Sequence, residues 1–164
     1  MKYFDLAISE AFSLGYNYAD YIGGGGCGEV YKVSKHRAIK LTKDILEVSG
    51  VKKLIGRTNS YVVRYHSLNY TSNGLYIIEM DLGDKQDENF TIDDFILENY
   101  HKLEYLENND ISHLSFNDYL IMKDIIYGVR ELKSIGITPH DIKIDNTIKL
   151  KDRTLLLDIQ DISK

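Results

Sequence analysis

Five of the six residues from Gly23 to Gly28 are glycines, and this run constrains the possible folds of the chain more than any other feature. Glycine has no Cβ atom, so a run of glycines disfavours a helix and suits a tight turn. The segments 16–22 and 29–33 on either side carry strand-forming side chains. We therefore expect a hairpin of two strands, joined by a turn whose backbone can approach a ligand closely.

The apolar pattern around this hairpin predicts two helices and three further strands before residue 80. The expected ranges are helices at 4–14 and 44–55 and strands at 37–42, 61–68 and 75–80. Gly15 and Gly56 are placed to end the two helices, and Asn73-Gly74 is placed to form the turn between the last two strands.

The pattern becomes mainly helical after Met80. A polar connection is followed by a helix that ends at Gly136 and by a short strand pair. The expected ranges are a connection at 81–86, helices at 92–107 and 116–135, and strands at 147–150 and 154–157. This change of pattern predicts an α+β fold in two parts, residues 1–80 and 81–164.

Composition and charge limit the functions of the chain. Its net charge of −5 disfavours nucleic acid as a partner, and no segment is long and apolar enough to span a membrane. Cys27 is the only cysteine, so the chain cannot form an internal disulfide. Residues 81–118 hold eleven acids against two lysines, which is either a solvated helix face or a docking surface for a basic partner. We expect a monomer.

The spacing Gly23-x-Gly25-x-x-Gly28-x-Val30 resembles the glycine-rich loop of the protein kinase family. In such a loop, backbone N–H groups turn toward the phosphates of a nucleotide. The same run is compatible with a flexible hairpin turn that binds nothing. A dinucleotide-binding turn is disfavoured because no helix follows the glycines directly.

Lys40 follows at a distance that suits the family's third-strand lysine, in a segment that begins Arg37-Ala38. The resemblance implies that this ammonium neutralises the nucleotide phosphates and pairs with a glutamate on the next helix. Glu47 is the only acid between Asp44 and Glu79 and is therefore the candidate. Asp44 and Glu47 also have the spacing of a helix capping box, which is a purely structural alternative.

The strongest resemblance lies in the segment Pro139-His140-Asp141-Ile142-Lys143-Ile144-Asp145-Asn146, which is similar to the family's pattern His-Arg-Asp-Leu-Lys-x-x-Asn. It implies that Asp141 is the catalytic aspartate, that Lys143 steadies the γ-phosphate and that Asn146 ligates a metal. Pro139 and His140 replace the family's histidine and arginine. That arginine normally contacts a phosphorylated activation loop.

Asp158 follows an apolar run and resembles the aspartate with which the family holds Mg²⁺. The usual Asp-Phe-Gly is Asp158-Ile159-Gln160 here. Loss of the glycine removes a backbone hinge, which predicts either a site that is always formed or a damaged one. The segment 75–83 also resembles the hinge of the family. There Ile78 would gate the adenine pocket, and Glu79 to Asp81 would supply backbone hydrogen bonds to the base.

These resemblances cover residues 18 to 158 and imply a minimal bilobal protein-kinase-like fold. An antiparallel five-stranded sheet with one helix would form the N-lobe, and a truncated helical C-lobe would follow. ATP with Mg²⁺ or Mn²⁺ would lie between them, with adenine against Val30 and Ala38. The family's activation segment would begin where this sequence ends, so we expect activity without loop phosphorylation.

The same resemblance extends to the compact effector kinases that bacteria inject into host cells. It implies transfer of the γ-phosphate to serine or threonine of a host or cellular protein, in the cytoplasm of the producing cell or of the host. Lys143 favours serine and threonine over tyrosine. Two alternatives stay open: an ATP-binding pseudokinase that acts as an interaction module, and a small-molecule phosphotransferase of the aminoglycoside-kinase type.

Overall fold

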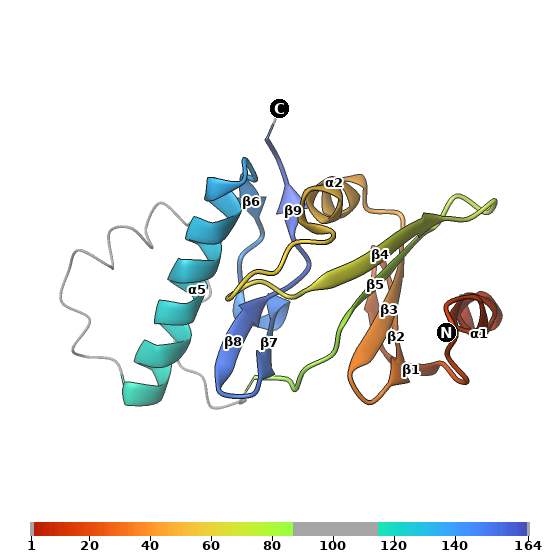
Figure 1. The fold of residues 1–164 in the computed structure, drawn as a ribbon, viewed down its shortest axis with the longest axis horizontal. Coiled ribbons are helices and arrows are strands. Elements are labelled where there is room, and N and C mark those ends of the chain that lie inside the picture. The colour runs from red at the N-terminus through yellow and green to blue at the C-terminus, as the bar shows by residue number, and fades with distance from the viewer. Residues whose placement is uncertain (1, 87–114, 164) are drawn as a thin grey trace. The chain divides into compact units, whose positions relative to one another are not determined.

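A computed structural model describes residues 2–86 and 115–163 of the chain. The predicted helix at 92–107 and most of the acidic segment 81–118 lie outside the described residues. The chain divides into two compact units, which are described separately (Figure 1). Unit 1 comprises Met1–Thr58 and Arg64–Leu82, and unit 2 comprises Asn59–Val63 and Gly83–Lys164.

Unit 1 is built on an antiparallel sheet of five strands in the order β1-β2-β3-β5-β4. The strands are β1 (Asp20–Gly25), β2 (Gly28–Ser34), β3 (Arg37–Thr42), β4 (Tyr65–Tyr70) and β5 (Tyr76–Asp81). The α+β class and the five-stranded antiparallel sheet predicted from the sequence are confirmed. The predicted strand 16–22 begins later, at Asp20, and runs into the glycines, because Gly23, Gly24 and Gly25 pair with β2.

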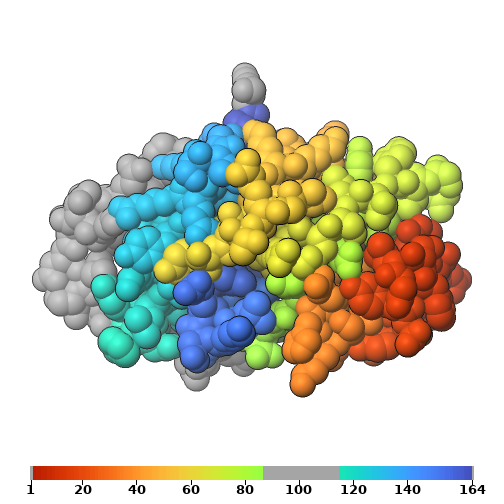
Figure 2. All heavy atoms as spheres, in the orientation of Figure 1, coloured from red at the N-terminus to blue at the C-terminus, as the bar shows by residue number. Residues whose placement is uncertain are grey.

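The two helices of unit 1, α1 (Phe4–Ser13) and α2 (Ile45–Leu54), lie on opposite faces of this sheet (Figure 1). Alternate residues of a strand point to opposite faces, so the central strand β3 is covered on both sides. On the α1 face the core is formed by Ala7, Ala11, Ala19, Tyr31, Val33, Ile39, Leu41 and Ile77. In the space-filling view, α1 lies directly against the sheet (Figure 2).

The described residues of unit 2 form one long helix, α5 (Phe116–Ser134), and three short strand and turn motifs. These are the pair β6 (Pro139–His140) with β9 (Gln160–Asp161), the pair β7 (Thr147–Leu150) with β8 (Arg153–Leu156), and the 3₁₀ turn η1 (Ile144–Asn146). The β7–β8 pair was predicted, whereas β6 and β9 are too short to give a periodic pattern. No helix in the described ranges is long and apolar enough to cross a membrane.

The helix ends follow the glycine positions. Gly15, Gly56 and Gly136 have φ values of +91°, +75° and +81°, and each lies two residues after the helix that it was predicted to end. A left-handed residue allows the chain to turn back on the last carbonyl groups, as when the Ile137 N–H donates to the Leu132 carbonyl over 3.0 Å. At its other end, α5 begins with the Ser115 hydroxyl accepting from the Asp118 N–H at 3.1 Å.

The predicted strand 61–68 is wrong in its first half. β4 begins only at Tyr65, and residues 61–63 belong to unit 2. There the Val63 N–H donates to the Leu156 carbonyl at 2.8 Å, and the Leu156 N–H donates to the Tyr61 carbonyl at 2.9 Å. An apolar run has the same pattern whichever sheet it joins, so periodicity could not separate the two halves.

Gly128 lets α5 approach the β7–β8 pair closely. A Cβ atom at this position would lie 2.8 Å from Cδ1 of Leu156 and 2.9 Å from the Tyr61 carbonyl oxygen. We expect Gly128→Ala to lower the free energy of unfolding by about 1–3 kcal/mol through overpacking, although alanine is the better helix former. Urea denaturation measures this loss.

Gly26→Ala is the matched control, because a Cβ atom at Gly26 would meet nothing within 4 Å. It should change stability by no more than about 0.5 kcal/mol. Equal stability of Gly128→Ala and the unchanged protein would contradict the close approach of α5 to Leu156.

Candidate functional site

Lys40 and Glu47 form the buried ion pair for which the sequence made Glu47 the candidate partner. The Lys40 Nζ lies 3.0 Å from Glu47 Oε1 and 2.9 Å from Oε2, and the two side chains are 9% and 2% exposed. The alternative role of a helix cap falls to Asp44, whose carboxylate accepts from the N–H groups of Leu46 and Glu47. The cap and the ion pair are therefore both present, on different side chains.

The register of the sheet collects three of the predicted nucleotide-binding residues on the face that carries Lys40. Val30 is opposite Lys40 across the β2–β3 pair. Ala38 lies two residues before Lys40 on the same strand and therefore on the same face. An ammonium is thus flanked by two small apolar side chains, an arrangement that suits a ligand with an apolar ring and an anionic group.

Close packing requires glycine at some positions of the turn and not at others. Gly28 is required by the sheet, since a Cβ atom there would lie 2.2 Å from the Leu41 carbonyl oxygen. Gly23 and Gly25 have no neighbour within 4 Å of a Cβ position, and neither has a positive φ. Glycine in a strand weakens it, so these two positions carry a conformational cost that the folded chain itself does not explain. Close approach of a ligand to the backbone would explain it.

The predicted hinge residues lie inside β5. The Asp81 N–H donates to the Arg64 carbonyl at 3.0 Å, so sheet pairing already engages this group. The Glu79 carboxylate lies on the opposite face from Lys40 and accepts from the hydroxyls of Tyr16 and Ser67. Burial, and then the hydrogen bond to Glu79, raise the pKa of Tyr16 to about 12. The roles of Glu79 and Asp81 toward a base remain predictions.

In unit 2 the predicted catalytic residues gather around the turn η1. The Lys143 Nζ lies 3.3 Å from Asp141 Oδ2. The Asn146 Nδ2 donates to the Asp141 carbonyl at 2.8 Å and lies 3.4 Å from its Oδ2. Asp141 itself has φ +57°, in the left-handed region that costs energy for a residue with a side chain. The loop thus holds one carboxylate beside one ammonium in a backbone conformation that needs support.

Asp158 is brought next to this loop by the β7–β8 register. Thr147 pairs with Leu156, and the Leu157 N–H donates to the Asn146 carbonyl at 3.0 Å. Asp158 also has a left-handed backbone, with φ +55°. Both aspartates that the sequence singled out therefore adopt the same unusual conformation, which is typical of functional sites.

Asn146 and Asp158 fit a hard divalent cation such as Mg²⁺. Donation from Asn146 Nδ2 to Asp141 leaves the Asn146 Oδ1 as the amide atom suited to ligation, and Asp158 contributes a half-buried carboxylate. Oxygen ligands of this kind suit Mg²⁺ and Mn²⁺. In the described ranges no three His, Cys, Asp or Glu side chains cluster, so the remaining ligands would be water or phosphate oxygens.

Asp161 is a structural residue of this site that the sequence analysis missed. Its side chain is 2% exposed, and Oδ1 accepts from the N–H groups of Thr138, at 3.0 Å, and Ser163, at 2.9 Å. It lies in β9, where Gln160 pairs with His140 of β6. The segment after Asp158 is thus joined to the residues that precede Asp141. An acid three residues after Asp158 was visible in the sequence, but nothing there indicated its burial.

Comparison with solved structures shows a protein-kinase-like fold. The chain matches the PknI kinase domain of Mycobacterium tuberculosis with a TM-score of 0.60 and 17% identity, over 88% of this chain and 58% of that one. It matches Rad53 1-466 in complex with AMP-PNP with a TM-score of 0.57 and 17% identity, over 87% of this chain and 38% of that one. No family model and no curated protein match the sequence.

The chain therefore spans about 58% of the length of the PknI domain that it resembles. At this level of identity the likeness concerns the fold alone. The contacts of Lys40 and of Asp141 described above are those of this chain and do not depend on the likeness.

Removal of one member of the Lys40–Glu47 pair should destabilise unit 1. Lys40→Met leaves the Glu47 carboxylate buried without the lysine, and we expect a loss of about 3–5 kcal/mol in the free energy of unfolding. The double variant Lys40→Met/Glu47→Leu should recover much of this loss, because it buries no unpaired charge. Urea denaturation measures both.

Lys52→Met is the matched control, since Lys52 is an exposed lysine of α2. It should change stability by less than about 0.5 kcal/mol. If Lys40→Met is no less stable than this control, the pair contributes nothing to unit 1.

Asp161→Ala should release the segment that follows Asp158. We expect the amides of Thr138 and Ser163 to exchange hydrogen faster, and a stability loss of about 1–3 kcal/mol, because both N–H groups lose a charged acceptor. Hydrogen exchange followed by NMR tests this, with the exposed Asp152→Asn as control. Unchanged protection of Thr138 would show that Asp161 does not join the two segments.

Proposed function

We propose that this protein is an ATP-dependent kinase that transfers the γ-phosphate to serine or threonine of a protein substrate. The observation that carries the proposal is the geometry of the catalytic loop. Asp141, Lys143 and Asn146 are joined by direct contacts, and the backbone of Asn146 is hydrogen-bonded to the residue before Asp158. The kinase-like fold gives this loop its context.

Each side chain has a role that its surroundings support. Asp141 would accept the proton of the substrate hydroxyl, and the neighbouring Lys143 ammonium would stabilise negative charge on the transferred phosphoryl group. Asn146 and Asp158 would hold Mg²⁺, which neutralises phosphate charge when bound. In unit 1, Lys40 would contact phosphate oxygens while Glu47 orients its ammonium.

The substrate would be a protein of the producing cell or of a host, by the resemblance to compact effector kinases. Lys143 supports serine or threonine as the acceptor rather than tyrosine. The acidic segment 81–118 would suit a basic docking partner. In this proposal, no arginine contacts a phosphorylated activation loop, because His140 occupies the position of that arginine. The segment after Asp158 is held instead by the pairing of β6 with β9.

An ATP-binding pseudokinase is the second candidate, and the pairing of His140 with Gln160 favours it. These two residues stand where the family has its arginine and its hinge glycine. The pair joins the segment before Asp141 to the segment after Asp158. In the pseudokinase, this link would hold the site in an inactive arrangement. Binding of Mg-ATP without turnover would support this candidate, and phosphate transfer would exclude it.

The test is transfer of labelled γ-phosphate from ATP to proteins of a eukaryotic lysate. We expect the unchanged protein to label a substrate. Asp141→Asn should lose at least about 100-fold of the rate, the usual loss when an acid–base group is removed. Asp158→Ala should also lose most of the rate, because it removes a ligand of the metal that neutralises phosphate charge. Asp145→Asn is the matched control, because Asp145 is an exposed acid of the same loop. It should retain the rate.

Thermal shift with Mg-ATP separates the candidates if no labelling occurs. A raised melting temperature without transfer would leave the pseudokinase, and no shift would exclude both. Equal labelling by Asp141→Asn and the unchanged protein would show that a contaminating enzyme, or a different site, transfers the phosphate.

A further inference from the structure

Glu29 is a buried acid that the proposed chemistry does not use. It follows Gly28 directly, at the exit of the glycine-rich turn, and it is 9% exposed. In β2 the side chains alternate, so Val30 shares the face of Lys40 whereas Glu29 and Tyr31 point to the α1 face. One face of the strand that leaves the turn therefore belongs to the candidate nucleotide site, and its other face contacts α1.

On the α1 face, Glu29 collects donors from the residues that precede α1. Its Oε1 accepts from the Lys2 N–H at 2.6 Å, and its Oε2 accepts from the Tyr3 N–H at 3.1 Å and from the Tyr31 hydroxyl. Burial alone would raise the pKa of Glu29. The hydrogen bonds from Tyr31, Tyr3 and Lys2 outweigh burial and lower the pKa to about 2, so the group is charged at neutral pH.

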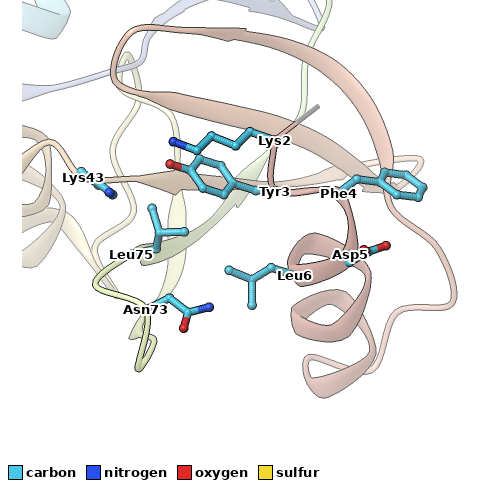
Figure 3. A pocket seen from close by; sticks show the side chains of 8 residues that line it. All are labelled: Lys2, Tyr3, Phe4, Asp5, Leu6, Lys43, Asn73 and Leu75. Carbon is cyan, nitrogen blue, oxygen red and sulfur yellow. The ribbon is translucent and has the colours of Figure 1, made fainter.

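The residues at the start of the chain are held by polar contacts as well as by apolar packing. Lys2, Tyr3 and Leu6 line a hollow of about 800 Å³ together with Lys43, Asn73 and Leu75 (Figure 3). Tyr3 and Leu6 are only partly buried against the core. The polar contacts of Glu29 join the backbone of residues 2–3 to the strand that leaves the turn.

Two further contacts limit the movement of the same turn. Across the hairpin, Gly24 is opposite Glu29, and a Cβ atom at Gly24 would lie 2.9 Å from the Tyr21 hydroxyl and 3.3 Å from Glu29 Cγ. A side chain at position 24 would therefore have to displace Tyr21 or Glu29. At the tip, the Cys27 carbonyl accepts from the Thr42 hydroxyl at 2.9 Å and from the Lys43 N–H at 3.3 Å.

We propose that Glu29 is a positioning residue, which fastens residues 2–3, and with them the start of α1, to the strand leaving the glycine-rich turn and so holds the turn in the form that binds the nucleotide phosphates. This proposal rests on the proposed function for its ligand, but not for the fastening itself. It implies that α1 sets the affinity of the turn for ATP from the opposite face of the sheet, without touching the nucleotide.

The experiment compares Glu29→Gln with the unchanged full chain by two measurements. Hydrogen exchange of the amides of residues 24–28, followed by mass spectrometry, reports on the turn without any nucleotide. Calorimetric titration with Mg-ATP gives the dissociation constant. We expect exchange about tenfold faster in the turn and a dissociation constant about three- to tenfold higher, since a charged acceptor of three donors is lost. The β5 amides serve as an internal reference.

Asp20→Asn is the matched control, because Asp20 is an exposed acid of the same hairpin. It should leave both measurements unchanged. If Glu29→Gln does not fold, Tyr31→Phe removes only one of the three donors and should show the same changes in smaller degree.

The outcomes separate this proposal from the function on which it rests. Exchange in residues 24–28 at the rate of the unchanged protein would overturn the fastening. Faster exchange with an unchanged dissociation constant would overturn its link to nucleotide binding. If the unchanged protein does not bind Mg-ATP, the proposed function fails, and the exchange measurement still decides whether Glu29 holds the turn.

Discussion

The alternation of side chains along β3 is the constraint on which the rest of unit 1 depends. Ile39 and Leu41 point to the core under α1, so Ala38 and Lys40 must point to the other face. A lysine buried there is costly unless it is paired, and α2 supplies Glu47 at 2.9 Å. A shift of one residue in the register of β3 would place Lys40 in the apolar core and separate it from Glu47.

The same alternation in β2 gives the strand that leaves the glycine-rich turn two different faces. Val30 shares the face of Lys40, whereas Glu29 joins the hydrogen bonds on the α1 face. Gly28 allows β2 to approach β3, and Gly24 leaves room for Glu29 and Tyr21. A Cβ atom at Gly23 or Gly25 would meet no neighbour within 4 Å, so close packing does not require glycine at either position.

Unit 2 positions its functional residues through two very short strand pairs. The β7–β8 pair brings Asn146 to the residue before Asp158, and the β6–β9 pair joins the segments before Asp141 and after Asp158. Pairs of two to four residues contribute little stability by themselves. Their hold is reinforced by the Asp161 carboxylate and by α5, which Gly128 allows to approach Leu156.

The order of the elements and the residue types of the candidate site could be predicted from the sequence. Periodicity located α2, α5, β3 and the β7–β8 pair to within two residues, and the glycines marked the ends of the helices. These signals are local, because they depend on residues close together in the chain. The spacing of Asp44 and Glu47 showed the limit of such signals, since a cap and an ion pair require the same residue types.

Only the tertiary structure decided which contacts these residues make. It divided the predicted strand 61–68 between two units, placed Glu79 on the face away from Lys40, and revealed the roles of Glu29 and Asp161. Each of these depends on partners far along the chain, such as residues 2–3 for Glu29. The cost of burying a polar group selects one partner for it, but the sequence does not show which groups are buried until the fold brings them together.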